Sequence, residues 1–240
     1  MTVATTTVVA PELVHYLPIG TTAIAIAFLI ALIYRASKRN WAPHLVWWAI
    51  GVAAYGLGTA FESSITLFGN SPELTRWWYW AGAILGGYPL ATGSVYLLHK
   101  RRTANILTGL SLIVVLVATV GIFMSPLKLE LLEPQRPSGA VVAWTWVRLT
   151  TPFINTYAAV FLIGGAIWSS AKFIQSGTQP RRAAGTALIA LGALLPGIGG
   201  SMAKAGIVEA LYIGEFFGLI LIWIGYEFCI RGPKPAPATE

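Results

Sequence analysis

Residues 17–34 read LPIGTTAIAIAFLIALIY and contain no charged side chain. A helix needs about 20 mostly apolar residues to cross the hydrocarbon core of a bilayer, so this stretch predicts a membrane-spanning helix. The basic connector RASKRN follows at 35–40. An apolar run followed by a short polar connector is typical of a multi-pass membrane protein, and the pattern recurs along the chain.

Seven segments of the 240-residue chain are long and apolar enough to span a membrane. The composition agrees, since 56% of the residues are hydrophobic and only 10% are charged, whereas soluble domains carry about 25% charged residues. We therefore expect an all-α membrane protein whose single domain is a seven-transmembrane-helix bundle. The expected spans are 17–34, 43–68, 77–98, 104–124, 148–170, 183–203 and 208–230.

The chain is expected to divide into three parts. Residues 1–16 form an extracytoplasmic N-terminal segment, residues 17–230 form the seven-helix domain, and residues 231–240 form a disordered cytoplasmic tail. The tail sequence GPKPAPATE is rich in proline and alanine, a composition that does not build a packed core. The longest connector, 125–146, contains several prolines, which forbid a long helix there.

Lysine and arginine are unevenly distributed between the two sets of connectors. Eleven lie after the first, third, fifth and seventh expected spans, and five lie in the opposite connectors. The positive-inside rule then places the N-terminus outside and the C-terminus in the cytoplasm, as in a multi-pass protein of the bacterial inner membrane. This asymmetry accounts for the net charge of +7. The expected partner of the basic clusters is the lipid bilayer, not nucleic acid.

Most of the ten tryptophans are expected at the two membrane–water interfaces. Tryptophan is enriched at the headgroup level because its ring is apolar while its N–H is polar. Those near the expected span ends are Trp41, Trp47, Trp48, Trp77, Trp78, Trp80, Trp144 and Trp146.

Three expected spans contain an internal proline: Pro89, Pro152 and Pro196. Proline removes a backbone donor and frees a carbonyl, which a membrane helix tolerates where neighbouring helices or water satisfy the freed group. Glycines accompany two of these prolines, in GAILGGYP and LLPGIGGS. We expect kinks or local unwinding, and two interpretations stay open: close helix packing, or a hinge or ligand cavity.

The second expected span includes AYGLGTAFESSITLFG at 54–69, where Glu62 stands among apolar and small residues. At 1.5 Å per residue, Glu62 lies roughly 9 Å below the outer end of its helix. Glu215 in the seventh span lies roughly 10 Å below its outer end, and Asn155 of the fifth span is near the same level. Ionisable groups within a span are costly and usually functional. These residues therefore predict a polar centre in the outer half of the bundle.

Arg148, at the outer end of the fifth span, is the cation expected beside these acids. In a structural interpretation, Arg148 pairs with Glu62 or Glu215 and locks the helices together. In a functional interpretation, the acids and the arginine form the floor of an outward-facing pocket for a small molecule or a lipid headgroup. The expected ligand-binding residues are Glu62, Arg148, Asn155, Glu215, Tyr88 and Tyr212, with Tyr55, Phe153 and Tyr157 as further aromatic candidates.

The sequence indicates no catalytic residue, no metal ligand and no particular cofactor. It contains no HExxH and no CxxC motif, and Cys229 is its single cysteine. His44 and His99 are expected on the same side of the membrane, but both lie beside basic residues near the interface, where a solvated histidine is common. An enzyme is therefore disfavoured.

The stretch 45–102, which includes AYGLGTAFESS, TRWWYWAG and LGGYPLATG, resembles the seven-helix N-terminal membrane sensor region of bacterial histidine kinases and diguanylate cyclases. That family has a glutamate late in its second helix, a Trp/Tyr-rich start to its third helix and a proline in the middle of the third. Glu62, the run from Trp78 to Trp80 and Pro89 match these features. The stretch 181–223 is similar to its sixth and seventh helices. The resemblance implies a bundle that senses an external or membrane-embedded signal and passes it to a cytoplasmic domain.

The leading expectation is a stand-alone seven-helix membrane sensor or ligand-binding protein that signals through a separate membrane or cytoplasmic partner. Its pocket would face outward, and the three prolines would be its flexible points. Two alternatives stay open. One is an accessory subunit of a larger membrane complex associated with a pigment, a quinone or haem. The other is a small-solute or proton-coupled transporter, although the internal repeats frequent in transporters are not evident here.

Overall fold

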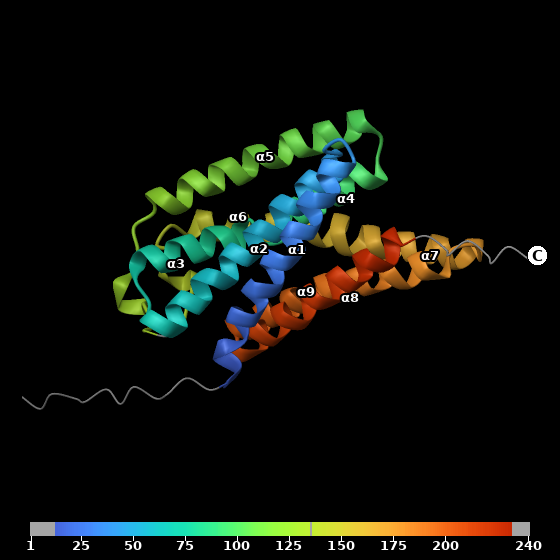
Figure 1. The fold of residues 1–240 in the computed structure, drawn as a ribbon. Helices are drawn as coiled ribbons and strands as arrows, with labels where there is room; N and C mark the ends of the chain where they lie inside the picture. Colours follow the sequence, from blue (N-terminus) through green and yellow to red (C-terminus); the bar gives the residue numbers. More distant parts are fainter. Residues whose placement is uncertain (1–12, 135, 232–240) are drawn as a thin grey trace, which may run out of the picture.

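The computed structural model of the chain describes residues 13–134 and 136–231, and these residues form a helical bundle (Figure 1). Seven helical segments are long and apolar enough to cross a membrane, so the expected all-α architecture is confirmed. They are Leu13–Lys38, Pro43–Phe68, Pro72–Leu98, Arg101–Met124, Thr145–Ser176, Pro180–Ala203 and Glu209–Ile230. Residues 1–12 of the predicted N-terminal segment and residues 232–240 of the predicted tail lie outside the described residues.

Two of the seven segments are divided into successive helical pieces. The third contains α3 (Pro72–Trp78), a π-helical turn (Tyr79–Ile84) and α4 (Tyr88–Leu98). The fifth contains α6 (Thr145–Ala158), a π-helical turn (Ala159–Gly164) and α7 (Gly165–Ser176). The others are α1 (Leu17–Lys38), with a short 3-10 turn (Leu13–Tyr16) before it, α2 (Pro43–Phe68), α5 (Arg101–Met124), α8 (Pro180–Lys204) and α9 (Glu209–Ile230).

Successive segments run in opposite directions, so their connectors gather at two ends of the bundle (Figure 1). The end that we call the N-terminal end lies at the lower left of Figure 1, and the C-terminal end lies to the right. The N-terminal end holds residues 13–16, 69–71, 125–144 and 205–208, and the C-terminal end holds residues 39–42, 99–100, 177–179 and 231.

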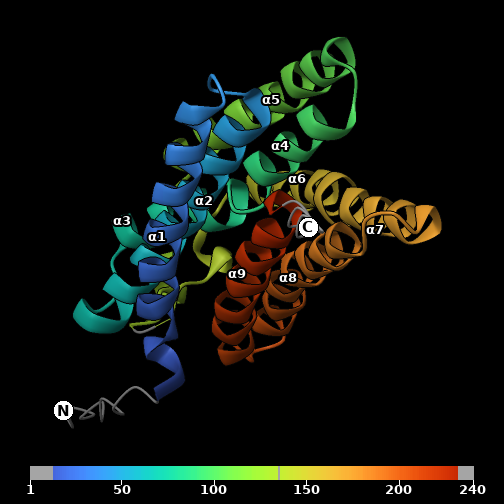
Figure 2. The same cartoon turned by 45° about the vertical axis from the view of Figure 1, so that its right-hand side comes forward.

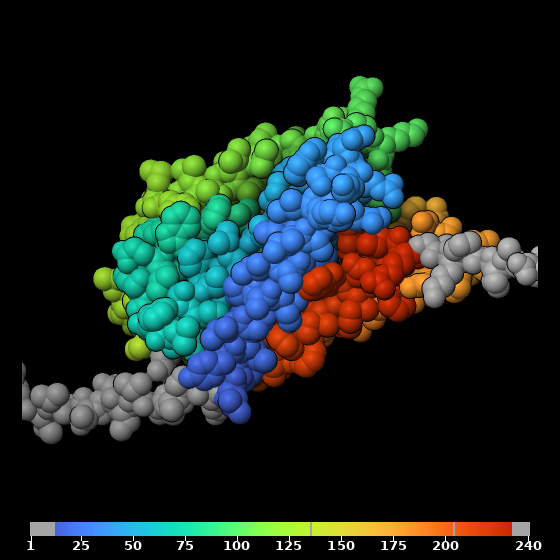
Figure 3. All heavy atoms as spheres, in the orientation of Figure 1, coloured from blue at the N-terminus to red at the C-terminus, as the bar shows by residue number. Residues whose placement is uncertain are grey.

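Helix α1 lies between α2 and α9. The space-filling view shows α1 running diagonally across this face, with α2 and α3 on one side and α9 on the other (Figure 3). On the side of α2, the hydroxyl groups of Thr22 and Thr59 lie 2.9 Å apart. A Cβ built on Gly56 would lie 3.0 Å from Ala25 Cβ, which shows how closely small residues bring the two backbones together. The other face of α1 exposes Ile26 and Ile30, as expected for a lipid-facing surface.

Helices α8 and α9 form the closest pair in the fold and lie side by side in Figure 2. At their crossing, a Cβ built on Gly192 would lie 2.5 Å from the carbonyl oxygen of Gly218, and one built on Gly218 would lie 2.6 Å from that of Gly192. Small residues allow membrane helices to approach until their backbones touch. The glycines at this contact are Gly185, Gly192, Gly199, Gly214, Gly218 and Gly225.

The three internal prolines have different outcomes. Pro89 stands in the first turn of α4, directly after the interruption at 85–87, so local unwinding is confirmed there. A Cβ at Gly86 would lie 2.2 Å from the carbonyl oxygen of Gly82, so the interruption requires glycine. Pro152 lies inside α6, upstream of a π-helical turn. At Pro196, α8 continues without unwinding and the ring fits against Gly218, which agrees with the interpretation of close helix packing.

The connector between α5 and α6 is folded against the N-terminal end of the bundle. As predicted, it contains no long helix in its described part, only 3-10 turns at Leu129–Leu131 and Gly139–Val141. The side chain of Asn70 donates to the carbonyl oxygens of Glu133, at 2.9 Å, and Arg136, at 3.2 Å. These bonds hold the connector so that Arg136 lies near Glu209, the first residue of α9.

Candidate functional site

The candidate site is a pair of glutamates from two different spans, of which Glu62 is buried and Glu215 is half-buried. Glu62 of α2 and Glu215 of α9 place their carboxyl groups close enough to interact with each other. Glu62 is 1% exposed, and the Oε2 atom of Glu215 is also buried. The structure therefore brings together the two acids that the sequence singles out, although they are 153 positions apart in the chain.

Neighbouring helices hold both glutamates in place. The Tyr55 hydroxyl of α2 donates to the backbone carbonyl oxygen of Glu215 at 2.9 Å, which ties α2 directly to α9. Thr59, one turn before Glu62, is 1% exposed and joins α2 to α1 through Thr22. The pair thus lies where three helices are fastened to one another by polar contacts.

Trp78 is a site residue that is absent from the expected ligand-binding set. Its place at the membrane interface stays a prediction, and its indole Nε1 donates a hydrogen bond of 2.7 Å to Glu62 Oε1. Close contact between Gly58 of α2 and Gly82 of the π-helical turn brings the third span near enough for this bond. The sequence signal is weak, because a Cβ at Gly82, four residues after Trp78, would make only ordinary contact with the indole, 3.7 Å from Nε1. The family resemblance also includes Trp78, but it does not identify the partner.

The charge of the pair is not balanced by a neighbouring cation. Among the side chains that the structure describes, the three salt bridges involve Glu209 and Glu227, and neither Glu62 nor Glu215. Two adjacent carboxylates in a site of low polarity cannot both be ionised, and such pairs share a proton. The geometry therefore favours one proton held between Glu62 and Glu215.

Arg148 and Asn155 do not join the pair. Both are exposed on α6, and none of the salt bridges in residues 13–134 and 136–231 includes Arg148. The reason is the helical period, because Val147, Thr151 and Ile154 form the buried stripe of α6. Residues one position further along the chain consequently point away from the core. The expected pairing of Arg148 with the glutamates is wrong.

The aromatic candidates divide in the same way. Tyr212, three residues before Glu215 on α9, is 1% exposed. Tyr88 lies in a different cluster, with its hydroxyl 3.1 Å from Ser111 Oγ and its ring 5.5 Å from that of Tyr157. Phe153 is 73% exposed and lines no pocket near the glutamates. Tyr88 and Phe153 thus lie apart from the pair, and the outward-facing pocket stays a prediction.

A small polar network connects the neighbourhood of Tyr212 to the surface at the N-terminal end. The rings of His15 and Tyr212 are 5.8 Å apart in an edge-on arrangement. His15 Nε2 lies 3.6 Å from Glu209 Oε1, and Arg136 Nη2 donates to the same oxygen at 3.2 Å. His15 and Arg136 lie outside the group of residues that the sequence analysis proposed for the site.

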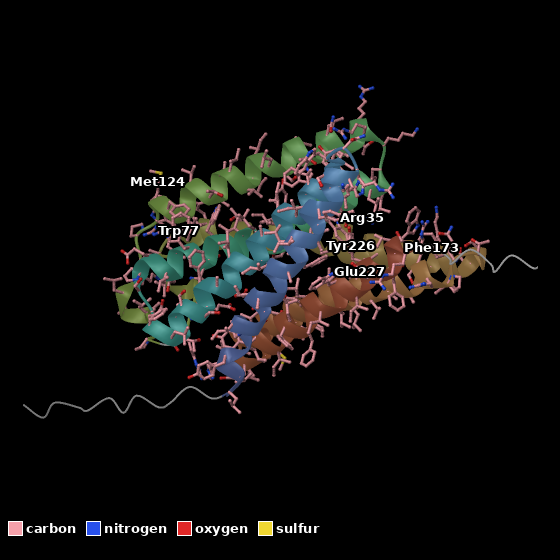
Figure 4. The ribbon with its side chains drawn as sticks, viewed as in Figure 1. Arg35, Trp77, Met124, Phe173, Tyr226 and Glu227 are labelled. Carbon is pink, nitrogen blue, oxygen red and sulfur yellow. The ribbon has the colours of Figure 1, made fainter. Side chains whose placement is uncertain are left out.

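At the C-terminal end, an open groove lies on α8 and α9, lined by Arg181, Trp223, Ile224, Glu227, Phe228 and Arg231. Glu227 and Arg231 form an ion pair there, with Nε and Oε2 3.1 Å apart. Figure 4 shows Glu227 and Tyr226 at this end of α9, near Arg35 of α1. In the described residues, no cluster of three or more histidine, cysteine or acidic side chains is placed to hold a metal ion.

Trp78→Phe is expected to destabilise the bundle by about 1–3 kcal/mol, because Glu62 Oε1 then stays buried without its donor. Thermal unfolding in detergent measures the effect. Trp77→Phe is the matched control, since Trp77 is 43% exposed and contacts the rings of Phe61 and Phe123. Equal melting temperatures for the two variants would show that the indole bond contributes nothing.

Comparisons with protein-family models, with curated proteins and with solved structures found no match to this chain.

Proposed function

We propose that this chain is a seven-helix membrane sensor whose switching element is the contact between Glu62 of α2 and Glu215 of α9. The observation that carries the proposal is the close approach of two buried carboxyl groups from separate spans. When a ligand or a proton changes the charge of the two carboxyl groups, the force between α2 and α9 changes from attraction to repulsion. In a two-state protein, such a change shifts the population between conformations.

The packing around the pair supports a switching role. Helix α9 contacts α1 and α2 through ring contacts, such as Phe28 with Trp223 and Trp48 with Tyr226, and through the bond from Tyr55 to the Glu215 carbonyl. In contrast, α8 and α9 are joined backbone to backbone along their glycines. The α8–α9 pair is thus a unit that can move against α1 and α2. We propose that the N-terminal end faces the exterior of a bacterial inner membrane and that the movement is read by a partner at the C-terminal end.

A proton-coupled transporter is the second candidate. The interruption at 85–87 favours it, because broken spans are frequent in transporters. The region between Glu215 and Glu227 favours the sensor instead, since Leu219 and Ile222 fill it with buried apolar side chains. Transport requires a path past these residues. Uptake of protons or a labelled solute by proteoliposomes would support this second candidate.

Spin labels test whether the pair controls the helix arrangement. Cysteines replace the exposed Phe68 of α2 and Ile213 of α9 in a background that carries Cys229→Ala. We expect the label distance to shift by about 2 Å or more between the wild-type pair and a chain carrying Glu62→Gln and Glu215→Gln, as for helix shifts in other switches.

Glu227→Gln is the control, because Glu227 is a glutamate of the same helix that pairs with Arg231 far from the site. It is expected to leave the label distance unchanged. Identical distance distributions in the wild type and in the folded double variant would rule out the pair as a switching element.

A further inference from the structure

We infer that the Glu62–Glu215 pair is a proton-binding site that exchanges its proton with water at the N-terminal end, by way of Tyr212 and His15. The inference rests on the proposed function for what proton binding does to the helices. It adds that the ligand of the pair is a proton and names the route by which the proton reaches it.

Buried polar atoms without partners are concentrated along this route. Of the buried side-chain nitrogen and oxygen atoms in the described residues that have no hydrogen-bond partner, four belong to this region: His15 Nδ1, Glu62 Oε2, Tyr212 Oη and Glu215 Oε2. Buried polar groups are nearly always satisfied by protein or by ordered water. Four such atoms in one region indicate a site where mobile protons and water complete the hydrogen bonding.

The order of the groups forms a path of increasing exposure. Tyr212 lies in the electrostatic field of both carboxyl groups and of Glu209 and Arg136. His15 follows, with its ring against that of Tyr212, and then Glu209. The side chain of His15 is 11% exposed, that of Glu209 is 28% exposed and that of Arg136 is 41% exposed. The path therefore ends at the surface.

The sequence of α9 explains why its contributions align. Glu209, Tyr212 and Glu215 follow one another at intervals of three residues, and residues three apart lie on the same side of an α-helix. Tyr212 thus lies next to both acids on the surface of α9, between Glu209 and Glu215. The α5–α6 connector and the 3-10 turn before α1 supply Arg136 and His15.

Proton transfer along this path conserves protons at each step. His15 accepts a proton from water beside Glu209 at one ring nitrogen and releases one from the other. The Tyr212 oxygen accepts a proton through water as its own hydroxyl proton passes, also through water, to the carboxylate of the pair. One proton enters, one proton is bound between the carboxyl groups, and no other bond is made or broken.

The other titratable groups near the pair do not extend the path. Tyr55 faces it from α2, but its hydroxyl donates to the Glu215 backbone. The third span contributes the indole of Trp78, which does not titrate, and Thr22 is the polar group of α1 nearest to Thr59. Toward the C-terminal end, α9 continues with buried Leu219 and Ile222. Along α9, access is thus from the N-terminal end.

Infrared spectroscopy tests the site directly. We expect the full chain in lipid nanodiscs to show the carbonyl band of a protonated carboxyl group, which shifts on transfer into D2O. A chain carrying Glu62→Gln and Glu215→Gln is expected to lack this band. Tyr212→Phe is expected to slow the exchange about tenfold or more, since the relay then loses its hydroxyl.

Tyr226→Phe is the matched control, because Tyr226 is a second tyrosine of α9 whose buried hydroxyl has no partner, at the opposite end of the helix. It should leave the exchange rate unchanged. If Tyr212→Phe does not fold, His15→Gln tests the next group of the same path and is expected to slow exchange likewise.

The possible results distinguish the proton site from the sensor function. A carbonyl band that persists in the double glutamine variant overturns the inference, and so does exchange as fast in the folded Tyr212→Phe or His15→Gln variant as in the wild type. An exchangeable band together with unchanged spin-label distances would keep the proton site and reject the sensor function. Shifted distances without the band would reject the proton site alone.

Discussion

Gly192→Leu is expected to prevent folding of the bundle, and Gly192→Ala is expected to lower its stability by about 1–3 kcal/mol, the usual cost of overpacking. The added Cβ would lie 2.5 Å from the carbonyl oxygen of Gly218 and 2.9 Å from the backbone nitrogen of Ile222. Backbone atoms cannot rotate away as a side chain can, so α8 and α9 must separate. Yield of monodisperse protein and thermal unfolding in detergent measure the two effects.

Gly197→Ala is the control in the same helix. A Cβ at Gly197 would meet nothing within 4 Å, and alanine favours a helix over glycine by about 1 kcal/mol. This variant is therefore expected to be as stable as the wild type or slightly more so. If Gly192→Ala and Gly197→Ala behave alike, the close approach of α8 and α9 does not limit stability.

The second large effect is the loss of stability of the wild type as the pH rises. The folded state holds a shared proton between Glu62 and Glu215, which the unfolded chain releases, so the folded state binds more protons and stability falls with increasing pH. Loss of that proton leaves two adjacent buried charges, at a cost of about 3 kcal/mol or more. Glu62→Gln removes one charge and is expected to flatten this dependence.

Melting temperatures measured over a range of alkaline pH check the second prediction. The comparison between the wild type and Glu62→Gln cancels the titration of Tyr55 and Tyr212, which both chains contain. Glu227→Gln is expected to keep the dependence of the wild type. A Glu62→Gln variant that loses stability with pH as steeply as the wild type would show that the two carboxyl groups do not share a proton.

Much of the fold was predictable because length and hydropathy decide which segments can cross a membrane. The expected segment 43–68 coincides with Pro43–Phe68, and 104–124 lies within Arg101–Met124. Depth along two helices of opposite direction also placed Glu62 and Glu215 at the same level. Rise per residue determines depth, and it needs no knowledge of the packing.

The contacts of the site could not be predicted, because the depth of a residue along its helix does not tell which way its side chain points around the helix axis. Arg148 and Asn155 have the right depth, yet α6 turns Val147 and Thr151 inward and leaves both polar residues exposed. Trp78 has the position of an interface residue, yet its indole points to Glu62. Helix rotation is set by the sum of contacts with several neighbours, which no single segment encodes.

The sequence by itself determined that the chain has seven apolar spans and that two carboxyl groups lie in the same half of the bundle, because both follow from local composition and helix geometry. Only the tertiary structure decided that these carboxyl groups meet each other and not an arginine, that Trp78 supplies the donor, and that Tyr212 and His15 lead toward the surface. These contacts form because glycines let helices that are far apart in the chain approach each other closely. They stabilise the fold only once the helices are packed.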